Sequence, residues 1–299
     1  MGEGEFEKHL GIRIGGLGVQ LLADQYILRK GENKLQSLFA FPEGEPHILL
    51  KIHLGEAPFF RNGRKIAELR DGRSCRTLYY TKDCCYILQS SSLSYPYYYF
   101  AKIRKELNCC DIYFSGAKNM RKRGIDFLTR QFQPLFVLMC YFQDSFKGLF
   151  MHASAISDNG HGRVFIGKSG SGKSTLARLW SIEKGCTTLC DDIVIVREKR
   201  SVLRIYGTPW TSDTSLCSPK EALLKELFFI KHAKRNAAHC LFGRAILESL
   251  LRSSLLDFSC PEIVTQAFDL FGQLVRKIPC YELGFVPNKS IVDFIRSLD

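Results

Sequence analysis

The chain has 299 residues, of which 45% are hydrophobic and 24% are charged, and its formal net charge is +12. This composition indicates a folded protein with a sizeable core, in one large domain or two smaller ones. No apolar run reaches the roughly 18 residues of a membrane-spanning helix, and residues 1–16 lack the apolar core of a secretory signal, so we expect a cytoplasmic protein with no membrane partner.

Cysteine spacing and charge disfavour two further classes of site. None of the twelve cysteines forms a Cys-x-x-Cys pair, which argues against zinc and thioredoxin-like sites. We expect the vicinal pairs Cys84-Cys85 and Cys109-Cys110 to be reduced. Basic clusters occur at residues 120–123, 197–200 and 231–235, but no aromatic side chains interleave with them as in nucleic-acid-binding modules. They therefore favour solvated surfaces or an acidic partner over nucleic acid.

The first part of the chain, residues 1–117, is expected to be rich in β-strands. Short apolar or alternating runs, broken by Gly, Pro, Asn and Asp, lie at residues 12–23, 47–55, 77–81, 85–91 and 95–103. We find no catalytic constellation in this region.

The second part, residues 118–299, begins with a helical pattern over residues 121–146, in which Pro134 precedes a short, very apolar segment that we expect to be buried. Strands are predicted at 148–157 and 163–167, joined by a tight turn at 158–162. A helix over 173–185, a short strand at 186–190 and a hairpin of 193–198 with 202–207 follow. Further helices are predicted at 220–233, 244–257, 260–277 and 290–299. The fold class is therefore α/β (α+β), with a core at 148–215 and a helical C-terminal part at 216–299.

A glycine-rich motif lies between the predicted strand at 163–167 and the helix that follows. Residues 167–174, GKSGSGKS, match G-x-x-x-x-G-K-[ST] without a mismatch. Glycines let backbone N–H groups surround a phosphate at the positive end of a helix, the lysine reaches β- and γ-phosphate oxygens, and the serine hydroxyl binds Mg²⁺. We expect ATP or another nucleoside triphosphate, with Mg²⁺, to bind at Ser169, Gly170, Ser171, Gly172, Lys173, Ser174 and Thr175.

An acidic pair and a histidine accompany this motif. Asp191 and Asp192 follow one helix and one short strand after Lys173, so the chain is expected to return to the same cleft. Adjacent carboxylates beside a magnesium nucleotide can divide the work, one holding the metal and the other accepting a proton from an attacking hydroxyl. His152 lies on the strand that precedes the motif and can orient a carboxylate.

Together, His152, the loop at 167–174 and the Asp191-Asp192 pair resemble the HPr kinase/phosphorylase family, and more broadly the phosphoenolpyruvate-carboxykinase-like P-loop superfamily. The glycine- and arginine-containing loop that HPr kinases carry beyond the aspartates has no counterpart here, where residues 206–215 read YGTPWTSDTS. The chain is more similar to the HPr-kinase-like kinases of ribosomal peptide gene clusters, including lasso-peptide kinases.

The resemblance implies an ATP-dependent kinase that transfers the γ-phosphoryl group to a serine-like hydroxyl of a small peptide or protein, such as a ribosomal precursor peptide. Its implied catalytic residues are His152, Lys173, Asp191 and Asp192. Ser174 and Asp192 are the preferred metal ligands, and Asp191 is the preferred base. In this interpretation residues 208–212 and 231–235 line an acceptor site. A small-molecule kinase and a non-catalytic nucleotide-binding regulatory module remain alternatives, and the sequence leaves a homo-oligomer open.

Overall fold

The computed structural model describes residues 8–23, 39–40, 46–55, 63–71, 74–81, 85–92, 99–104, 108–114, 133–143, 145–212, 216–256 and 261–298. The chain divides into two compact units: Met1–Arg13 with Leu17–Phe146, and Ile14–Gly16 with Lys147–Asp299. The sequence places a boundary between residues 117 and 118, whereas the packing places it after Phe146, because helix α4 (Gln133–Tyr141) groups with the first unit.

The first unit is built around one eight-stranded sheet with the order β1-β2-β3-β8-β7-β6-β5-β4. Its strands are β1 (Lys8–Ile14), β2 (Leu17–Ala23), β3 (Ile48–Leu54), β4 (Arg64–Asp71), β5 (Ser74–Tyr80), β6 (Cys85–Ser92), β7 (Tyr99–Arg104) and β8 (Cys109–Phe114). The expected β-rich character is confirmed. Strands β4 and β8 were not predicted: the charged residues of β4 hide its apolar alternation, whereas β8 is a short segment that is apolar apart from Asp111. The apolar segment after Pro134 is the buried face of α4, as expected.

Some sequence features lie outside the described residues of this unit. These are Cys84, the side chain of Cys85, and the basic cluster at 120–123. Cys109 and Cys110 are described, and both are buried free thiols, as predicted.

The second unit contains a second eight-stranded sheet, with the order β10-β9-β12-β13-β14-β16-β15 and with β11 paired to β9. Its strands are β9 (Gly148–Asp158), β10 (His161–Ile166), β11 (Cys186–Cys190), β12 (Ile193–Lys199), β13 (Val202–Tyr206), β14 (Glu221–His232), β15 (Ala237–Cys240) and β16 (Cys280–Phe285). Strand β10 also pairs in parallel with β14, so β9, β12, β13, β14 and β10 form a closed ring of pairings.

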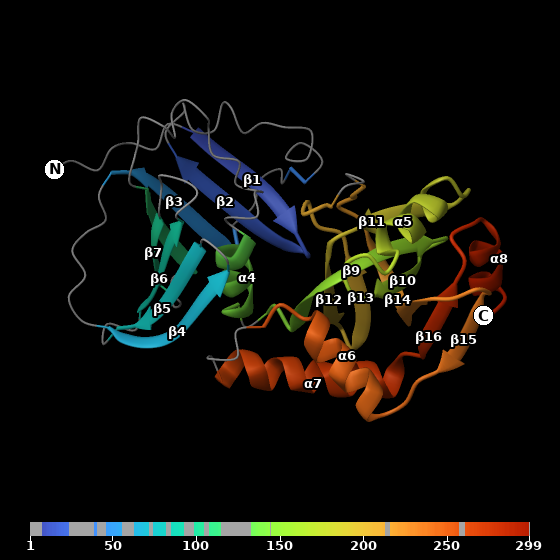
Figure 1. Ribbon diagram of the computed structural model, residues 1–299. Helices are drawn as coiled ribbons and strands as arrows, with labels where there is room; N and C mark the ends of the chain where they lie inside the picture. Colours follow the sequence, from blue (N-terminus) through green and yellow to red (C-terminus); the bar gives the residue numbers. More distant parts are fainter. Residues whose placement is uncertain are drawn as a thin grey trace. The chain divides into compact units, whose positions relative to one another are not determined.

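Helices cover both faces of this sheet (Figure 1). Helices α6 (Arg244–Ser253) and α7 (Pro261–Lys277) pack on one face, against a cluster that includes Met151, Val164 and Leu227. Helices α5 (Lys173–Ser181) and α8 (Ser290–Arg296) pack on the other face, against Phe165 and Phe228. Because successive residues of a strand point to opposite faces, neighbouring residues such as Val164 and Phe165 serve different layers. The fold is mixed α/β.

The prediction of a helical C-terminal part is wrong over residues 221–232, which form strand β14. This segment contains Leu, Lys and Glu, which favour helices, and propensity misled the prediction. Its side chains from Glu221 to Leu224 alternate between exposed and buried, and residues 226–230 are all buried, between β10 and β16. Tertiary packing therefore overrides local preference. Cys280–Phe285 is also a strand, whereas the helices expected near 244–257, 260–277 and 290–299 are present.

A buried ion-pair cluster fastens the last helix to the sheet. Arg163 on β10 is only 1% exposed and lies 3.0 Å from Asp158 and 2.8 Å from Glu226. Arg296 on α8 lies 2.9 Å from the same Asp158 carboxylate and, like Arg163, lies over the ring of Trp180. Burial raises the pKa of Asp158, but the hydrogen bonds from Arg296 and Cys186 and the charges of both arginines outweigh it and hold that pKa below its ordinary value.

Candidate phosphoryl-transfer site

The glycine loop, residues 167–172, joins the end of β10 to the first residue of α5, as the sequence predicts. Gly170 and Gly172 have φ angles of +79° and +103°, a region that side chains disfavour. A Cβ atom on Gly172 would also lie 2.5 Å from the Phe285 ring. The loop therefore needs glycine for both conformation and space, and it leads into the amino end of a helix, where backbone N–H groups favour an anion.

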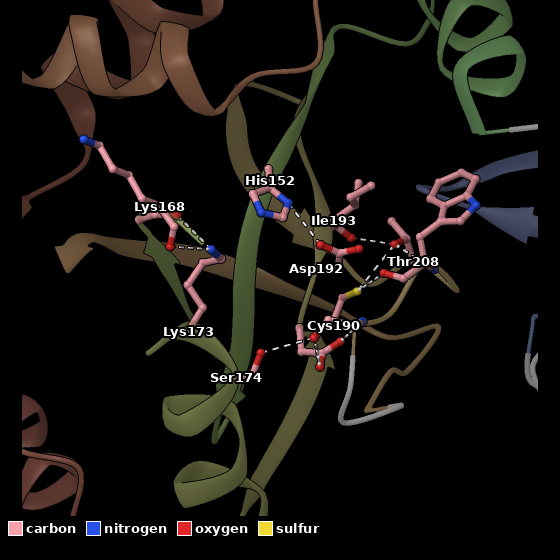
Figure 2. Close-up of polar contacts among 12 residues, drawn as sticks. His152, Lys168, Lys173, Ser174, Cys190, Asp192, Ile193 and Thr208 are labelled. Atoms are coloured by element: carbon pink, nitrogen blue, oxygen red, sulfur yellow. Dashed lines mark hydrogen bonds and ion pairs between the residues drawn. The ribbon is translucent and has the colours of Figure 1, made fainter. Parts of the chain in front are cut away.

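Lys173 is nearly buried and points back into the glycine loop (Figure 2). Its Nζ atom donates hydrogen bonds to the carbonyl oxygens of Gly167, at 2.7 Å, and Lys168, at 3.2 Å. Burial lowers the pKa of Lys173, and the negative charge of Asp192 opposes that effect. The ammonium group is thus held within the loop, where a phosphate would take its hydrogen bonds.

Asp191 reaches the start of α5 through a serine that the sequence analysis placed only in a possible acceptor loop. The Ser212 backbone N–H donates to Asp191 Oδ1 at 2.9 Å, and its hydroxyl donates to Oδ2 at 2.7 Å. The same hydroxyl lies 3.1 Å from the hydroxyl of Ser174. Asp191, Ser212 and Ser174 therefore form one continuous chain of hydrogen bonds.

Asp192 pairs with the histidine. His152 Nδ1 on β9 lies 3.0 Å from Asp192 Oδ1, and Figure 2 shows the ring directed at this carboxylate. The pairing of β9 with β12 explains the contact, because His152 lies opposite Ile193, the residue that follows Asp192. The main chain adds a hydrogen bond of 3.0 Å from the Ala153 N–H to the Asp192 carbonyl. The two aspartates are both buried but have different partners.

The loop after β13 carries Ser212 and is fixed by buried hydrogen bonds. The Thr208 hydroxyl donates to the Ile193 carbonyl at 2.5 Å, and the Cys190 thiol donates to the Trp210 carbonyl at 3.0 Å. A Cβ on Gly207 would collide with the carbonyl oxygen of Ser218. Thr208 is fully buried, so its hydroxyl serves this anchorage and does not face an acceptor.

The basic cluster at 231–235 lies at the end of β14, beside the glycine loop. His232 Nε2 lies 3.0 Å from the Gly170 carbonyl oxygen, and Lys231 forms an ion pair with Glu282 at 2.5 Å. Lys234 and Arg235 are exposed. The contact between His232 and the glycine loop was not predicted, because the segment before it was taken for a helix.

The oxygen atoms at the start of α5 suit a hard divalent cation. Mg²⁺ prefers hydroxyl and carboxylate oxygens and is usually held by one or two carboxylates together with substrate phosphates. Ser174, Ser212 and Asp191 offer such a set. Within the described ranges, no group of three or more His, Cys, Asp or Glu side chains is placed to hold a metal. The donor set therefore fits magnesium bound with a nucleotide better than a soft metal bound by protein alone.

Comparisons with known proteins give similarities among solved structures. No protein-family model matches the chain, and no curated protein matches it. Among solved structures, the chain is similar to the Hpr(Ser) kinase/phosphatase from Coxiella burnetii, with 12% identity over 50% of this chain and 91% of that chain and a TM-score of 0.27. An identity and a TM-score this low do not support a conclusion about this chain's fold or function. The fold assigned here therefore rests on the strand pairings and the site on its own geometry.

No helix in the part of the chain that the structure describes has the length and apolarity needed to cross a membrane.

Proposed function

We propose that this chain is an ATP-dependent kinase that transfers the γ-phosphoryl group to a hydroxyl of a peptide or small protein. One observation carries the proposal: the two buried carboxylates that follow β11 reach the residues at the start of α5. Asp191 is linked to Ser174 through Ser212, and Asp192 acts electrostatically on Lys173. A nucleotide-binding module without turnover needs no proton acceptor beside its phosphate loop.

The residues divide into three tasks in this proposal. The glycine-loop N–H groups and Lys173 bind the phosphates and balance the charge that develops on them. One carboxylate of the Asp191-Asp192 pair accepts the proton of the acceptor hydroxyl, and the other holds the cation. His152 orients the Asp192 carboxylate. Magnesium, when bound, neutralises charge on the β- and γ-phosphates.

In this proposal, phosphoryl transfer is a direct displacement at the γ-phosphorus. The acceptor oxygen forms a bond to the γ-phosphorus while the bond to the bridging oxygen of the β-phosphate breaks. The hydroxyl proton passes to the carboxylate, and ADP leaves. To accept this proton, the carboxylate must lie within hydrogen-bonding reach of the acceptor hydroxyl.

The acceptor is proposed from the sequence resemblance and from the charge beside the loop. The resemblance to HPr-kinase-like peptide kinases implies a serine-like hydroxyl on a short chain, such as a ribosomal precursor peptide. The exposed Lys234 and Arg235 follow His232, which contacts the glycine loop, and they would favour acidic residues near the acceptor.

The proposal is tested by incubating the purified protein with γ-labelled ATP, Mg²⁺ and serine-containing peptides with acidic or basic flanks. ADP formation and label on peptide serine are measured together. We expect labelled peptide and an equal amount of ADP, both absent with Lys173→Ala. Label on a metabolite from an added cell extract, and none on peptides, would support a small-molecule kinase. Tight ATP binding without ADP would support a regulatory module.

A further inference from the structure

We propose that Ser212 is a ligand of the divalent cation in this site, together with Ser174 and Asp191. The inference rests on the proposed function, because it concerns the cation that accompanies the nucleotide. It assigns a role to a residue on the loop after β13. It also separates the roles of the two aspartates, because Asp191 then binds the cation and Asp192 accepts the proton of the acceptor hydroxyl.

The distances among the three oxygens carry the assignment. Ser212 Oγ lies 3.1 Å from Ser174 Oγ and 2.7 Å from Asp191 Oδ2. An octahedral Mg²⁺ ion with bonds of 2.0–2.1 Å places neighbouring ligand oxygens about 3 Å apart. Ser212 Oγ therefore already lies at the spacing of a neighbouring ligand from both other oxygens, so a cation can replace these two hydrogen bonds without a large movement of Ser212.

The loop that carries Ser212 is firmly anchored, which indicates that the contacts of Ser212 with Asp191 and Ser174 are not accidental. Ser212 follows a segment in which Thr208 and Trp210 are buried and held by hydrogen bonds to Ile193 and Cys190. The Ser212 amide also donates to Asp191 Oδ1, which fixes the orientation of the carboxylate. A ligand set held by its own supporting bonds loses little freedom when the metal binds.

The partners of the second aspartate lead to the same division. Asp192 Oδ1 is paired with His152 at 3.0 Å. A histidine hydrogen-bonded to a carboxylate fixes its orientation, which suits a proton acceptor that must be aimed at a hydroxyl. Asp191 has instead two hydroxyl-bearing neighbours, Ser212 and, beyond it, Ser174, which suits a hard cation.

The test uses the full chain and a non-hydrolysable ATP analogue, whose affinity is measured by calorimetry with Mg²⁺, with Cd²⁺ and with EDTA. In the wild-type chain we expect Mg²⁺ to strengthen binding. Ser212→Ala should reduce that gain by about 10-fold or more, the scale of lost metal-site support. Ser212→Cys should lose the gain with Mg²⁺ and recover it with Cd²⁺, because sulfur prefers the softer ion.

Controls separate this inference from the proposed function. Ser181→Ala removes a hydroxyl at the other end of α5 and should match the wild type, and the wild type in Cd²⁺ corrects for binding to native thiols. If Ser212→Ala keeps the full Mg²⁺ gain, or if Ser212→Cys responds alike to Mg²⁺ and Cd²⁺, Ser212 is not a ligand while the kinase proposal stands. If the wild type binds no nucleotide, both fail.

Discussion

Among the residues of the site, Lys173 is the one whose replacement should lower ADP formation most directly. Its Nζ atom already lies within hydrogen-bonding distance of two glycine-loop carbonyls. Because an electrostatic donor of this kind typically contributes 10²–10³-fold to the rate, we expect Lys173→Ala to lower ADP formation by about that factor or more. The exposed Lys184, on the turn after α5, provides the matched control Lys184→Ala, which should retain wild-type turnover. Equal turnover in the two variants would remove Lys173 from the site.

Replacing each aspartate by its amide should affect a different step, phosphoryl transfer for one and cation binding for the other. We expect Asp192→Asn to reduce transfer sharply while the Mg²⁺-dependent affinity for a non-hydrolysable ATP analogue stays near that of the wild type. Asp191→Asn should weaken that affinity, because an amide is a poorer ligand for a hard cation. Parallel calorimetry and turnover measurements decide the matter. The reverse pattern would restore the preference drawn from sequence alone, with Asp191 as base and Asp192 as metal ligand.

The sequence pointed to most residues of the candidate site, but not to the hydrogen bonds that join Ser212 to Asp191 and Ser174. The motif at 167–174 and the Asp191-Asp192 pair were visible because each has a recognisable pattern. Ser212 has no such pattern. Its place depends on the β12–β13 hairpin and on the buried hydrogen bonds of Thr208, which bring the loop back to α5. Contacts of this kind arise from tertiary packing, so a single sequence gives no signal for them.

At the level of elements, the ion-pair cluster around Arg163 should matter far more than ion pairs at the surface. Arg163→Leu removes the buried ion pair with Glu226 and leaves Asp158 to Arg296, and breaking a buried pair typically costs about 3–5 kcal/mol. The Arg204–Glu221 pair is 36% and 38% exposed, so Arg204→Ala should cost less than about 1 kcal/mol. Urea unfolding of both variants measures the difference. Similar losses in the two would mean that the buried cluster adds no special stability.

Elements in which the hydrophobic residues recur with a clear period were predicted well, and elements with an ambiguous hydrophobic period were not. The β9–β10 hairpin was visible because Asn159 and Gly160 mark a turn in which both residues have positive φ. Helix α5 was placed correctly at its start but ends at Ser181, before the Gly185 that we took as its stop. Strand β14 was missed because its composition favours a helix, and only its position between β10 and β16 makes it a strand.

For the whole molecule, the division into two units predicts unfolding in two steps. Each unit has its own eight-stranded sheet and its own buried residues. Units with separate cores unfold separately unless a large apolar interface joins them. We therefore expect calorimetry to show two transitions, with Arg163→Leu lowering only one of them. A magnesium nucleotide should raise that same transition, because ligand binding stabilises the unit that holds the site. One cooperative transition would contradict this expectation.

Strand β14 has a consequence for the speed with which the second unit forms. Its parallel neighbours β10 and β16 are distant from it in the sequence, and its own residues favour a helix over the extended state. Apart from its short pairing with β13, it therefore becomes part of the sheet only when β10 and β16, which are far from it in the sequence, come to lie beside it. Searches of this kind are slow, because the entropy of closing long loops is lost before the contacts are gained. Folding of the second unit should thus be limited by the pairing of this one strand, whose end carries the His232 contact to the glycine loop.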